Sequence, residues 1–303
     1  MTIRFDNRVA IVTGAGNGLG RTHALGLAAL GAKVVVNDFG GARDGTGGSS
    51  DAAKAVVEEI RKAGGIAIAN GANVASFEQV TAMVEQARSE FGRVDILINN
   101  AGILRDKSFS KMEMADFDAV MDVHLKGAVN CTKAVWELMR AQNYGRVLMT
   151  TSSSGLFGNF GQSNYAAAKM AVVGLMNALG IEGKKNDIRI NTLAPMAATR
   201  MTEDVMTPET LKNIRPDQVT PAALFLVSEN APNKTIISAG AGVFSAARIE
   251  DTAPVYIPES ELSPDAVAAR FAQITDWSTA RPYDGSPQHV QALVEVAMQG
   301  MKA

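Results

Sequence analysis

The sequence predicts an α/β fold in which a doubly wound parallel sheet is flanked by helices on both faces. Short runs rich in valine and isoleucine recur along the chain, and such runs are typical of strands buried on both sides. Alanine-rich segments with helical spacing separate them. Strands that alternate with helices of this length form parallel sheets through right-handed crossovers.

The individual elements can be assigned in order along the chain. We expect strands at the apolar runs 9–14, 33–38, 95–100, 146–152 and 188–195. We expect helices at 18–30, 50–63, 76–91, 115–141 and 163–185. Glycines stand where a helix must end before the next strand, a position that favours a left-handed residue: Gly31, Gly64 with Gly65, Gly92 and Gly145.

The length predicts one main domain and a C-terminal helical extension. The 303 residues would allow two domains, but a doubly wound sheet can use about 250 residues in one. We predict a main domain at 1–248, including a ligand-covering loop at 196–219, and an extension at 249–303. Its two expected helices lie near 263–274 and 286–300 and pack on the same domain or on a partner subunit.

The composition argues against several classes of partner. The chain has 29 basic and 31 acidic side chains and a net charge of −2, which creates no large field for nucleic acid or anionic lipid. No run of 18 apolar residues predicts a membrane span, and the N-terminal segment is a polar lead into a strand. A single cysteine, Cys131, indicates a reducing compartment, so we expect the cytoplasm. Three histidines without paired spacing predict no metal site.

A glycine-rich loop joins the first strand to the first helix. This layout brings backbone N–H groups and a helix N-terminus against a pyrophosphate, as in Rossmann-type dinucleotide-binding folds. The spacing is Gly-x-x-x-Gly-x-Gly, so the prediction depends on the strand before the loop and the helix after it. The residues expected to bind the cofactor here are Gly14, Gly16, Asn17, Gly18, Leu19 and Gly20.

Asp38 indicates which dinucleotide the loop binds. It ends the second strand, where a carboxylate accepts hydrogen bonds from the adenosine ribose hydroxyls and repels a 2′-phosphate. Asn17 and Phe39, which flank the same pocket, carry no positive charge, and Arg43 is the nearby exception. The pattern predicts NAD rather than NADP.

Tyr165 and Lys169 form a candidate acid–base pair. They lie four residues apart at the start of an expected helix, so they share one face. An ammonium group beside a phenol lowers the pKa of the phenol from about 10, which allows proton exchange with an alcohol near neutral pH. Ser152 ends the fourth expected strand at the carboxyl edge of the sheet, where open α/β proteins bind ligands.

These motifs resemble those of the short-chain dehydrogenase/reductase family over about residues 5–245. Residues 13–20 match the family's cofactor loop, 99–102 match its sheet-stabilising motif, and Ser152, Tyr165 and Lys169 match its catalytic set. The family commonly has a glycine directly after the proline that matches Pro195, and this chain has Met196 there. The resemblance implies further cofactor contacts from Tyr165, Lys169, Asn73, Val74, Asn100, Ala101, Gly102, Pro195 and Thr199.

His124 stands where the family has its fourth catalytic residue, an asparagine. Its neighbourhood VHLKG, with NAGILRDKSF at 100–109 and FGNFGQSNYAAAK at 157–169, resembles the (3R)-hydroxyacyl-CoA dehydrogenase subgroup found in peroxisomal multifunctional enzymes. His124 either packs a helix or maintains the water-linked proton path through which Lys169 reaches solvent. The likeness continues into the tail at LSPDAVAARFAQITDW.

The resemblance implies an NAD-dependent enzyme that oxidises a secondary alcohol to a ketone, with a (3R)-3-hydroxyacyl-CoA as the expected substrate. Tyr165 would exchange the proton, Ser152 would hold the oxygen and Lys169 would bind the nicotinamide ribose. Two alternatives stay open, a 17β-type hydroxysteroid dehydrogenase and a non-catalytic NAD-binding protein. The family's pairing of helices like 115–141 and 163–185 implies a homodimer, with a tetramer as the further possibility.

Overall fold

The computed structural model describes residues 2–198, 209 and 213–302 and has two compact units, Met1–Ala246 and Ala247–Ala303. An eight-stranded sheet forms the centre of the first unit, in the order β3-β2-β1-β4-β5-β6-β7-β8. The strands are β1 Val9–Thr13, β2 Lys33–Asn37, β3 Ile66–Asn70, β4 Ile96–Asn99, β5 Gly145–Thr150, β6 Ile188–Pro195, β7 Ile236–Gly240 and β8 Val243–Ala247.

The strand pairing confirms the doubly wound parallel sheet. Strands β1 to β7 pair in parallel, and the strand order reverses between β1 and β4. Ligands of open α/β sheets bind at this switch point, beyond the carboxyl ends of the strands. β8 follows β7 through a two-residue turn in which Ala241 and Gly242 both have positive φ angles.

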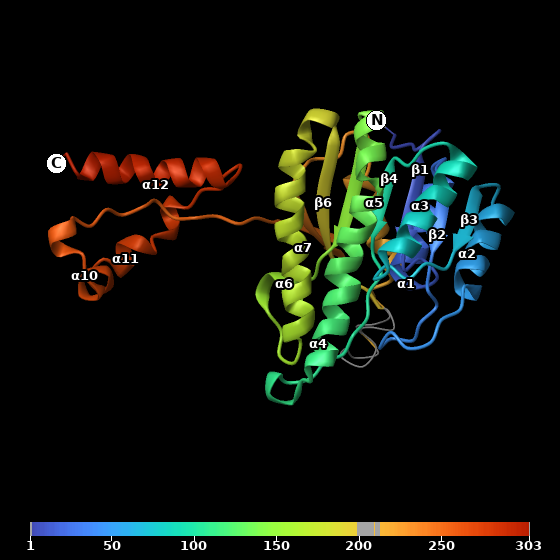
Figure 1. Cartoon of the computed structure of the whole chain (residues 1–303), viewed down its shortest axis with the longest axis horizontal. Coiled ribbons are helices and arrows are strands. Elements are labelled where there is room, and N and C mark those ends of the chain that lie inside the picture. The colour runs from blue at the N-terminus through green and yellow to red at the C-terminus, as the bar shows by residue number, and fades with distance from the viewer. Residues whose placement is uncertain (1, 199–208, 210–212, 303) are drawn as a thin grey trace. The chain divides into compact units, whose positions relative to one another are not determined.

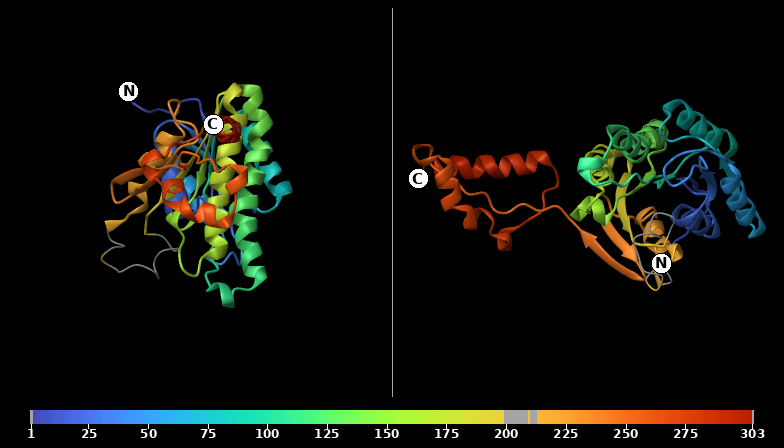
Figure 2. Two further views of the ribbon diagram at one scale, coloured as in Figure 1. Left: turned by 90° about the vertical axis from the view of Figure 1, so that its left-hand side faces the viewer. Right: turned by 90° about the horizontal axis from the view of Figure 1, so that it is seen from below.

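Helices cover both faces of the sheet, as Figures 1 and 2 show. α3 packs beside α5 and α4 beside α7, whereas α1 packs beside α2 and α9. The helices of this unit are α1 Gly18–Ala29, α2 Asp51–Lys62, α3 Phe77–Phe91, α4 Met114–Met121, α5 Gly127–Gln142, α6 Ser153–Phe157, α7 Ser163–Glu182 and α9 Thr220–Leu226. None of the helices described is both long and apolar enough to cross a membrane.

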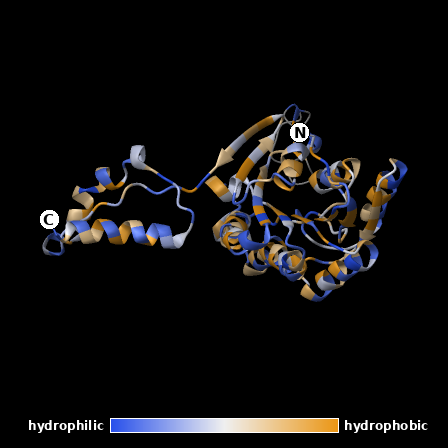
Figure 3. Ribbon diagram, turned by 90° about the horizontal axis from the view of Figure 1, so that it is seen from above, coloured by the Kyte–Doolittle hydropathy of each residue, from blue (hydrophilic) through white to orange (hydrophobic). Residues whose placement is uncertain are grey.

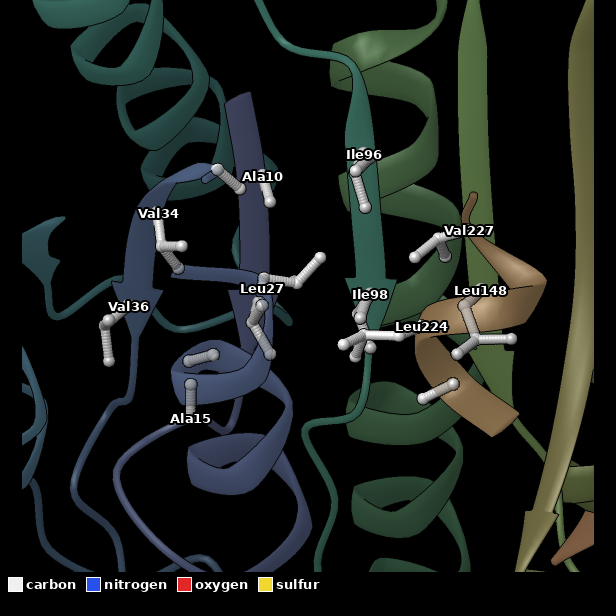
Figure 4. Close-up of a cluster of buried hydrophobic side chains, with 14 of the residues drawn as sticks. Ala10, Ala15, Leu27, Val34, Val36, Ile96, Ile98, Leu148, Leu224 and Val227 are labelled. Atoms are coloured by element: carbon white, nitrogen blue, oxygen red, sulfur yellow. The ribbon is translucent and has the colours of Figure 1, made fainter. Parts of the chain in front are cut away.

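A large apolar cluster lies between the sheet and the layer of α1, α2 and α9 (Figure 4). Leu27 of α1 and Leu224 of α9 contribute to it from the helical side. Each fully buried valine, leucine or isoleucine stabilises the fold by about 1.5–3 kcal/mol. The strand residues that face this layer include Ala10, Val34, Val36, Ile96, Ile98 and Leu148.

The sequence-based assignment differs from the structure in a few elements. β3 was not expected because its Ile-Ala-Ile-Ala-Asn sequence has few β-branched residues, and Ile66 is half exposed at the sheet edge. Gly31, Gly64 and Gly92 adopt the expected left-handed conformation, but the prediction for Gly145 was wrong. Asn143 ends α5 in that conformation, with φ 49°, which asparagine tolerates better than most residues.

Arg146 lies fully buried at the amino end of the sheet. Its guanidinium group donates to the carbonyl oxygens of Gly145, Asp187, Ser228 and Glu229 at 2.6–3.0 Å, and to the Asp187 carboxylate at 3.0 Å. The side chain therefore joins β5 to the loops before β6 and after α9. This buried charge lies at the amino ends of the strands, whereas the expected site lies at their carboxyl ends. Arg146 therefore stabilises the fold away from the site.

The second unit confirms the helical C-terminal extension. It contains α10 Pro264–Ala269, α11 Phe271–Ile274 and α12 Ser286–Gly300, and the Ser263 hydroxyl caps α10 by accepting from the Ala266 amide. An isolated antiparallel β-bridge pairs the backbones of Asp251 and Arg281, so the two ends of the segment between them lie together. α12 alternates apolar and polar residues along its length (Figure 3). How the extension packs stays a prediction.

Candidate active site

A cavity of about 380 Å³ lies at the carboxyl ends of the strands around the switch point. The connections after β1, β2, β3 and β4 all contribute to its wall. The expected cofactor residues that line it are Gly14, Asn17, Gly18, Leu19, Asp38, Asn73, Val74, Asn100, Ala101 and Gly102. Residues far apart in the sequence therefore meet around one space that suits a dinucleotide.

The glycine-rich loop is held close to the loop after β4. The Asn100 side-chain amide donates to the carbonyl oxygens of Thr13 and Gly14, both at 3.0 Å. Gly14 has φ +62°, and a Cβ there would lie 2.8 Å from the Cα of Ala101. A Cβ on Gly20 would overlap the Gly14 carbonyl oxygen. Only glycine fits at these positions, and the N-terminus of α1 beside them carries no acidic residue in its first turn.

Asp38 connects the β1 and β2 loops. Its two carboxylate oxygens accept hydrogen bonds from the backbone amides of Gly16 and Gly40, both at 2.7 Å. The same side chain lines the cavity, and Gly16 itself does not. The carboxylate is therefore held in place by the backbone at the position expected to meet the adenosine ribose.

Asn73 and Val74 lie at the end of the cavity formed after β3. The Asn73 side-chain Oδ1 atom accepts from the Ala75 amide at 3.0 Å, so this side chain orders its own turn. Pro195 ends β6 and lines neither of the cavities described here. Thr199 lies outside the residues that the structure describes.

Ser152, Tyr165 and Lys169 come together beyond the end of β5. Ser152 caps α6 by accepting from the Ser154 amide at 3.1 Å, and its side chain lies close enough to Tyr165 to act on the pKa of the phenol. Tyr165 and Lys169 share one face of α7, and the Lys169 Nζ atom lies 5.5 Å from the centre of the Tyr165 ring. Lys169 donates to the Thr150 carbonyl oxygen at 2.7 Å.

The pKa values of the pair differ from the simple expectation. Burial raises the pKa of Tyr165 to about 12, and the Ser152 hydroxyl only partly opposes this shift. Burial also lowers the pKa of Lys169 to about 7. The predicted lowering of the Tyr165 pKa was therefore wrong, because the loss of solvation on burial is the largest cause of the pKa shift of both groups.

His124 lies in a π-helical turn, Asp122–Lys126, between α4 and α5. Its Nε2 atom is 2.8 Å from the Ile103 carbonyl oxygen and 3.1 Å from the Ile103 amide nitrogen, and its ring meets the Tyr165 ring edge-on at 5.1 Å. A Cβ on Gly102 would overlap this imidazole. Burial, and then the charge of Lys169, hold the pKa of His124 well below its usual value, so the ring is neutral at pH 7.

A second, much smaller cavity of about 10 Å³ lies beside His124 and Lys169. Three buried polar atoms of its lining residues have no hydrogen-bond partner in the described part of the chain: Asn99 Oδ1, His124 Nδ1 and Thr150 Oγ1. This space is about the size of one water molecule and offers several polar partners, which are the conditions that buried water needs. Sequence reasoning did not find the π-helical turn, Asn99 as a polar group here, or Thr150.

Comparison with known proteins agrees with this geometry. Residues 8–210 match the short chain dehydrogenase family. The chain belongs to this family of oxidoreductases. Within the described residues, no group of three or more histidine, cysteine, aspartate or glutamate side chains could hold a metal ion.

Several members of the family are similar to this chain over most of its length. The chain is 49% identical over 275 residues to the peroxisomal multifunctional enzyme A of Dictyostelium discoideum, covering 90% of this chain and 61% of that relative. The structure of full-length peroxisomal multifunctional enzyme type 2 from Drosophila melanogaster matches with a TM-score of 0.83 and 35% identity, covering 98% of this chain and 50% of that one. The chain thus spans about three fifths or less of these two proteins.

A third match is a 7α-hydroxysteroid dehydrogenase, whose structure holds NADH and a 7-oxo bile acid derivative. Its TM-score is 0.71 at 33% identity, covering 79% of this chain and 95% of that one. The match to the multifunctional enzyme covers 98% of this chain, more than the match to the hydroxysteroid dehydrogenase.

Proposed function

We propose that this protein is an NAD-dependent dehydrogenase that interconverts (3R)-3-hydroxyacyl-CoA and 3-ketoacyl-CoA. The observation that carries the proposal is the meeting of Ser152, Tyr165 and Lys169 at the carboxyl edge of a sheet whose switch point holds a dinucleotide-sized cavity. Similarity to the multifunctional enzymes over nine tenths of the chain supports the substrate class.

In the proposed mechanism, Tyr165 acts as the phenolate and takes the hydroxyl proton of the substrate. Ser152 donates a hydrogen bond to the same oxygen and holds it beside the phenol. When bound, NAD would supply the hydride acceptor, held by the glycine-rich loop, Asp38 and Lys169. Loss of a hydride from the carbinol carbon and of a proton to Tyr165 converts the alcohol to a ketone.

The proton on Tyr165 must then leave a buried site. The small cavity beside Lys169 and His124 suits one water molecule, and it adjoins the π-helical turn, a feature often found at functional sites. The shorter contact of His124, to the Ile103 carbonyl oxygen, favours a proton on Nε2 and leaves Nδ1 as an acceptor beside the cavity. We propose that neutral His124 orients this water and that Lys169 passes the proton to it.

A substrate panel tests the function. The purified protein is assayed with NAD against both enantiomers of 3-hydroxybutyryl-CoA, both enantiomers of a medium-chain 3-hydroxyacyl-CoA and a 17-hydroxysteroid. We expect NADH formation with the (3R)-acyl-CoA substrates and much slower formation with the steroid. Preference for the steroid would favour the hydroxysteroid alternative, and NADH binding without turnover of any substrate would favour a non-catalytic NAD-binding protein.

We propose NAD rather than NADP because the Asp38 carboxylate lines the cavity. In Asp38→Asn the charge is lost but one acceptor oxygen remains, so the ratio of kcat/KM with NADP to that with NAD should rise about tenfold or more. Steady-state kinetics with both cofactors measures this ratio. Asp51→Asn removes an exposed carboxylate at the start of α2 and serves as the control. An unchanged ratio in Asp38→Asn would assign the selectivity to other residues.

The assembly and location proposed here rest on the sequence. We propose a homodimer formed through α5 and α7, with a tetramer as the further possibility, and light scattering on the purified protein distinguishes them. We propose the cytoplasm because Cys131 is a single buried thiol. Several relatives are named as peroxisomal proteins, so cell fractionation is the direct test.

A further inference from the structure

The connection between β2 and α2 is unusually long and forms part of the cavity wall. Its residues Phe39, Gly40, Gly41, Ala42, Arg43 and Gly45 line the cavity. The connection folds on itself, because the Ala42 amide donates to the Thr46 carbonyl oxygen at 2.7 Å and the Ser49 amide to that of Phe39 at 2.9 Å. We call residues 39–49 the cover loop. These two hydrogen bonds make it a folded structure and not a simple link between elements.

The cover loop is tied to the connection that follows β4. The Leu104 amide donates to the Arg43 carbonyl oxygen at 3.0 Å, and the Arg105 Nε atom donates to the Asp44 carbonyl oxygen, also at 3.0 Å. Gly45 approaches Ile103 so closely that a Cβ would lie 3.2 Å from the Ile103 side chain. Both segments line the cavity, so these contacts join two of its walls.

Arg105 connects this junction to the helical layer. Its guanidinium group lies 3.3 Å from the Asp116 carboxylate of α4, and Lys107 bonds to the same carboxylate at 2.8 Å. The charges of Lys107 and Arg105 help to hold the pKa of Asp116 below its usual value, so the carboxylate stays ionised at neutral pH. Arg105 is thus anchored on one side by Asp116 and holds the cover loop on the other.

We infer that the cover loop closes the adenosine side of the cofactor cavity and that Arg105 is the positioning residue that latches it and slows cofactor exchange. The inference rests on the proposed binding of NAD. Asp38, expected to meet the adenosine ribose, lines the cavity together with the loop. A dinucleotide bound there is enclosed along this side, and its adenosine end leaves when the contacts of Arg43 and Asp44 with residues 104 and 105 break.

Two alanine variants of the full chain test the latch. Arg105→Ala removes the contact with the cover loop, whereas Lys107→Ala removes a partner of the same carboxylate that makes no such contact. Release of NADH is followed by its fluorescence after rapid mixing with excess NAD. We expect release to be about tenfold faster in Arg105→Ala and unchanged in Lys107→Ala.

Hydrogen exchange of the Leu104 amide gives a second readout that does not depend on activity. This amide should be protected in the wild type and should exchange faster in Arg105→Ala but not in Lys107→Ala. If Arg105→Ala does not fold, Arg105→Lys replaces it, because a single ammonium group cannot reproduce the two-sided contacts of the guanidinium fork.

The outcomes separate the latch from the proposed function. Wild-type rates of NADH release and of Leu104 exchange in the Arg105 variant would overturn the latch alone, because NADH binding would be intact. Equal acceleration in the Lys107 and Arg105 variants would also overturn it, since the effect would then come from Asp116. Failure of the wild type to bind NADH would overturn the proposed function, and the latch with it.

Discussion

Tyr165→Phe is expected to lower kcat by about 10²- to 10⁴-fold, the range that general acid–base groups contribute. The change removes one oxygen atom and the proton that it carries, and it leaves the ring in contact with His124. Tyr165 does not line the larger cavity, so the affinity for NADH should stay nearly the same. Initial rates with a (3R)-3-hydroxyacyl-CoA and fluorescence titration with NADH measure the two effects.

The pH dependence adds a readout that a structural role would not change. The pKa of Tyr165 is about 12, so the phenol is neutral at pH 7 and the phenolate fraction increases as the pH rises. Oxidation of the alcohol needs the base, and its rate should therefore increase from pH 7 towards pH 10 in the wild type. This increase should disappear in Tyr165→Phe.

Tyr144→Phe is the matched control for the tyrosine variant. Tyr144 lies at the other end of the sheet, with the guanidinium groups of Arg8 and Arg146 at 3.7 and 4.2 Å from its ring centre. Phenylalanine retains that ring, so turnover should stay at the wild-type level. Retained activity in Tyr165→Phe would refute its role as the acid–base group.

Arg146→Met is expected to lower the free energy of unfolding by about 3–5 kcal/mol, because it removes five hydrogen bonds of a fully buried guanidinium group. The variant keeps most of the apolar stem but removes the guanidinium hydrogen bonds to the carbonyl oxygens of Asp187, Ser228 and Glu229. Urea unfolding followed by circular dichroism measures the change. NADH affinity of the folded fraction should remain, because Arg146 lies at the edge of the sheet opposite the cavity.

Arg140→Met provides the comparison for this stability effect. Arg140 pairs with Glu137 one turn away on α5, and both side chains are largely exposed. Exposed pairs of this kind contribute about 0–1 kcal/mol, so this variant should unfold almost as the wild type does. Similar losses in both variants would show that the buried position of Arg146 has no special importance.

Much of the cofactor site could be predicted because its signals are local. The glycines of the first loop, the acidic residue at the end of β2 and the four-residue spacing of Tyr165 and Lys169 each depend on short stretches of chain. The alternation of apolar runs and helices placed these stretches at the carboxyl edge of one sheet. The prediction for Gly145 was wrong because asparagine and glycine can both end a helix, and Asn143 comes first.

Other features depended on groups that come together only in space. Asn100 holds the glycine-rich loop across the switch point, and His124 contacts Ile103 and Tyr165 from a π-helical turn that the sequence did not predict. The cover loop has a recognisable composition, but its contact with Arg105 joins residues 61 positions apart. Such pairings have no periodic signal in the chain.

The amino-acid sequence was sufficient to establish the fold class, the dinucleotide loop and the identity of the candidate catalytic side chains, because backbone geometry and helical spacing act over a few residues. Only the tertiary structure decided the protonation of those side chains. Burial raises the pKa of Tyr165 and lowers that of Lys169, and burial is a property of everything packed around a group. The local pattern identified the candidate acid–base pair, and the surrounding fold shifts the pKa of each group.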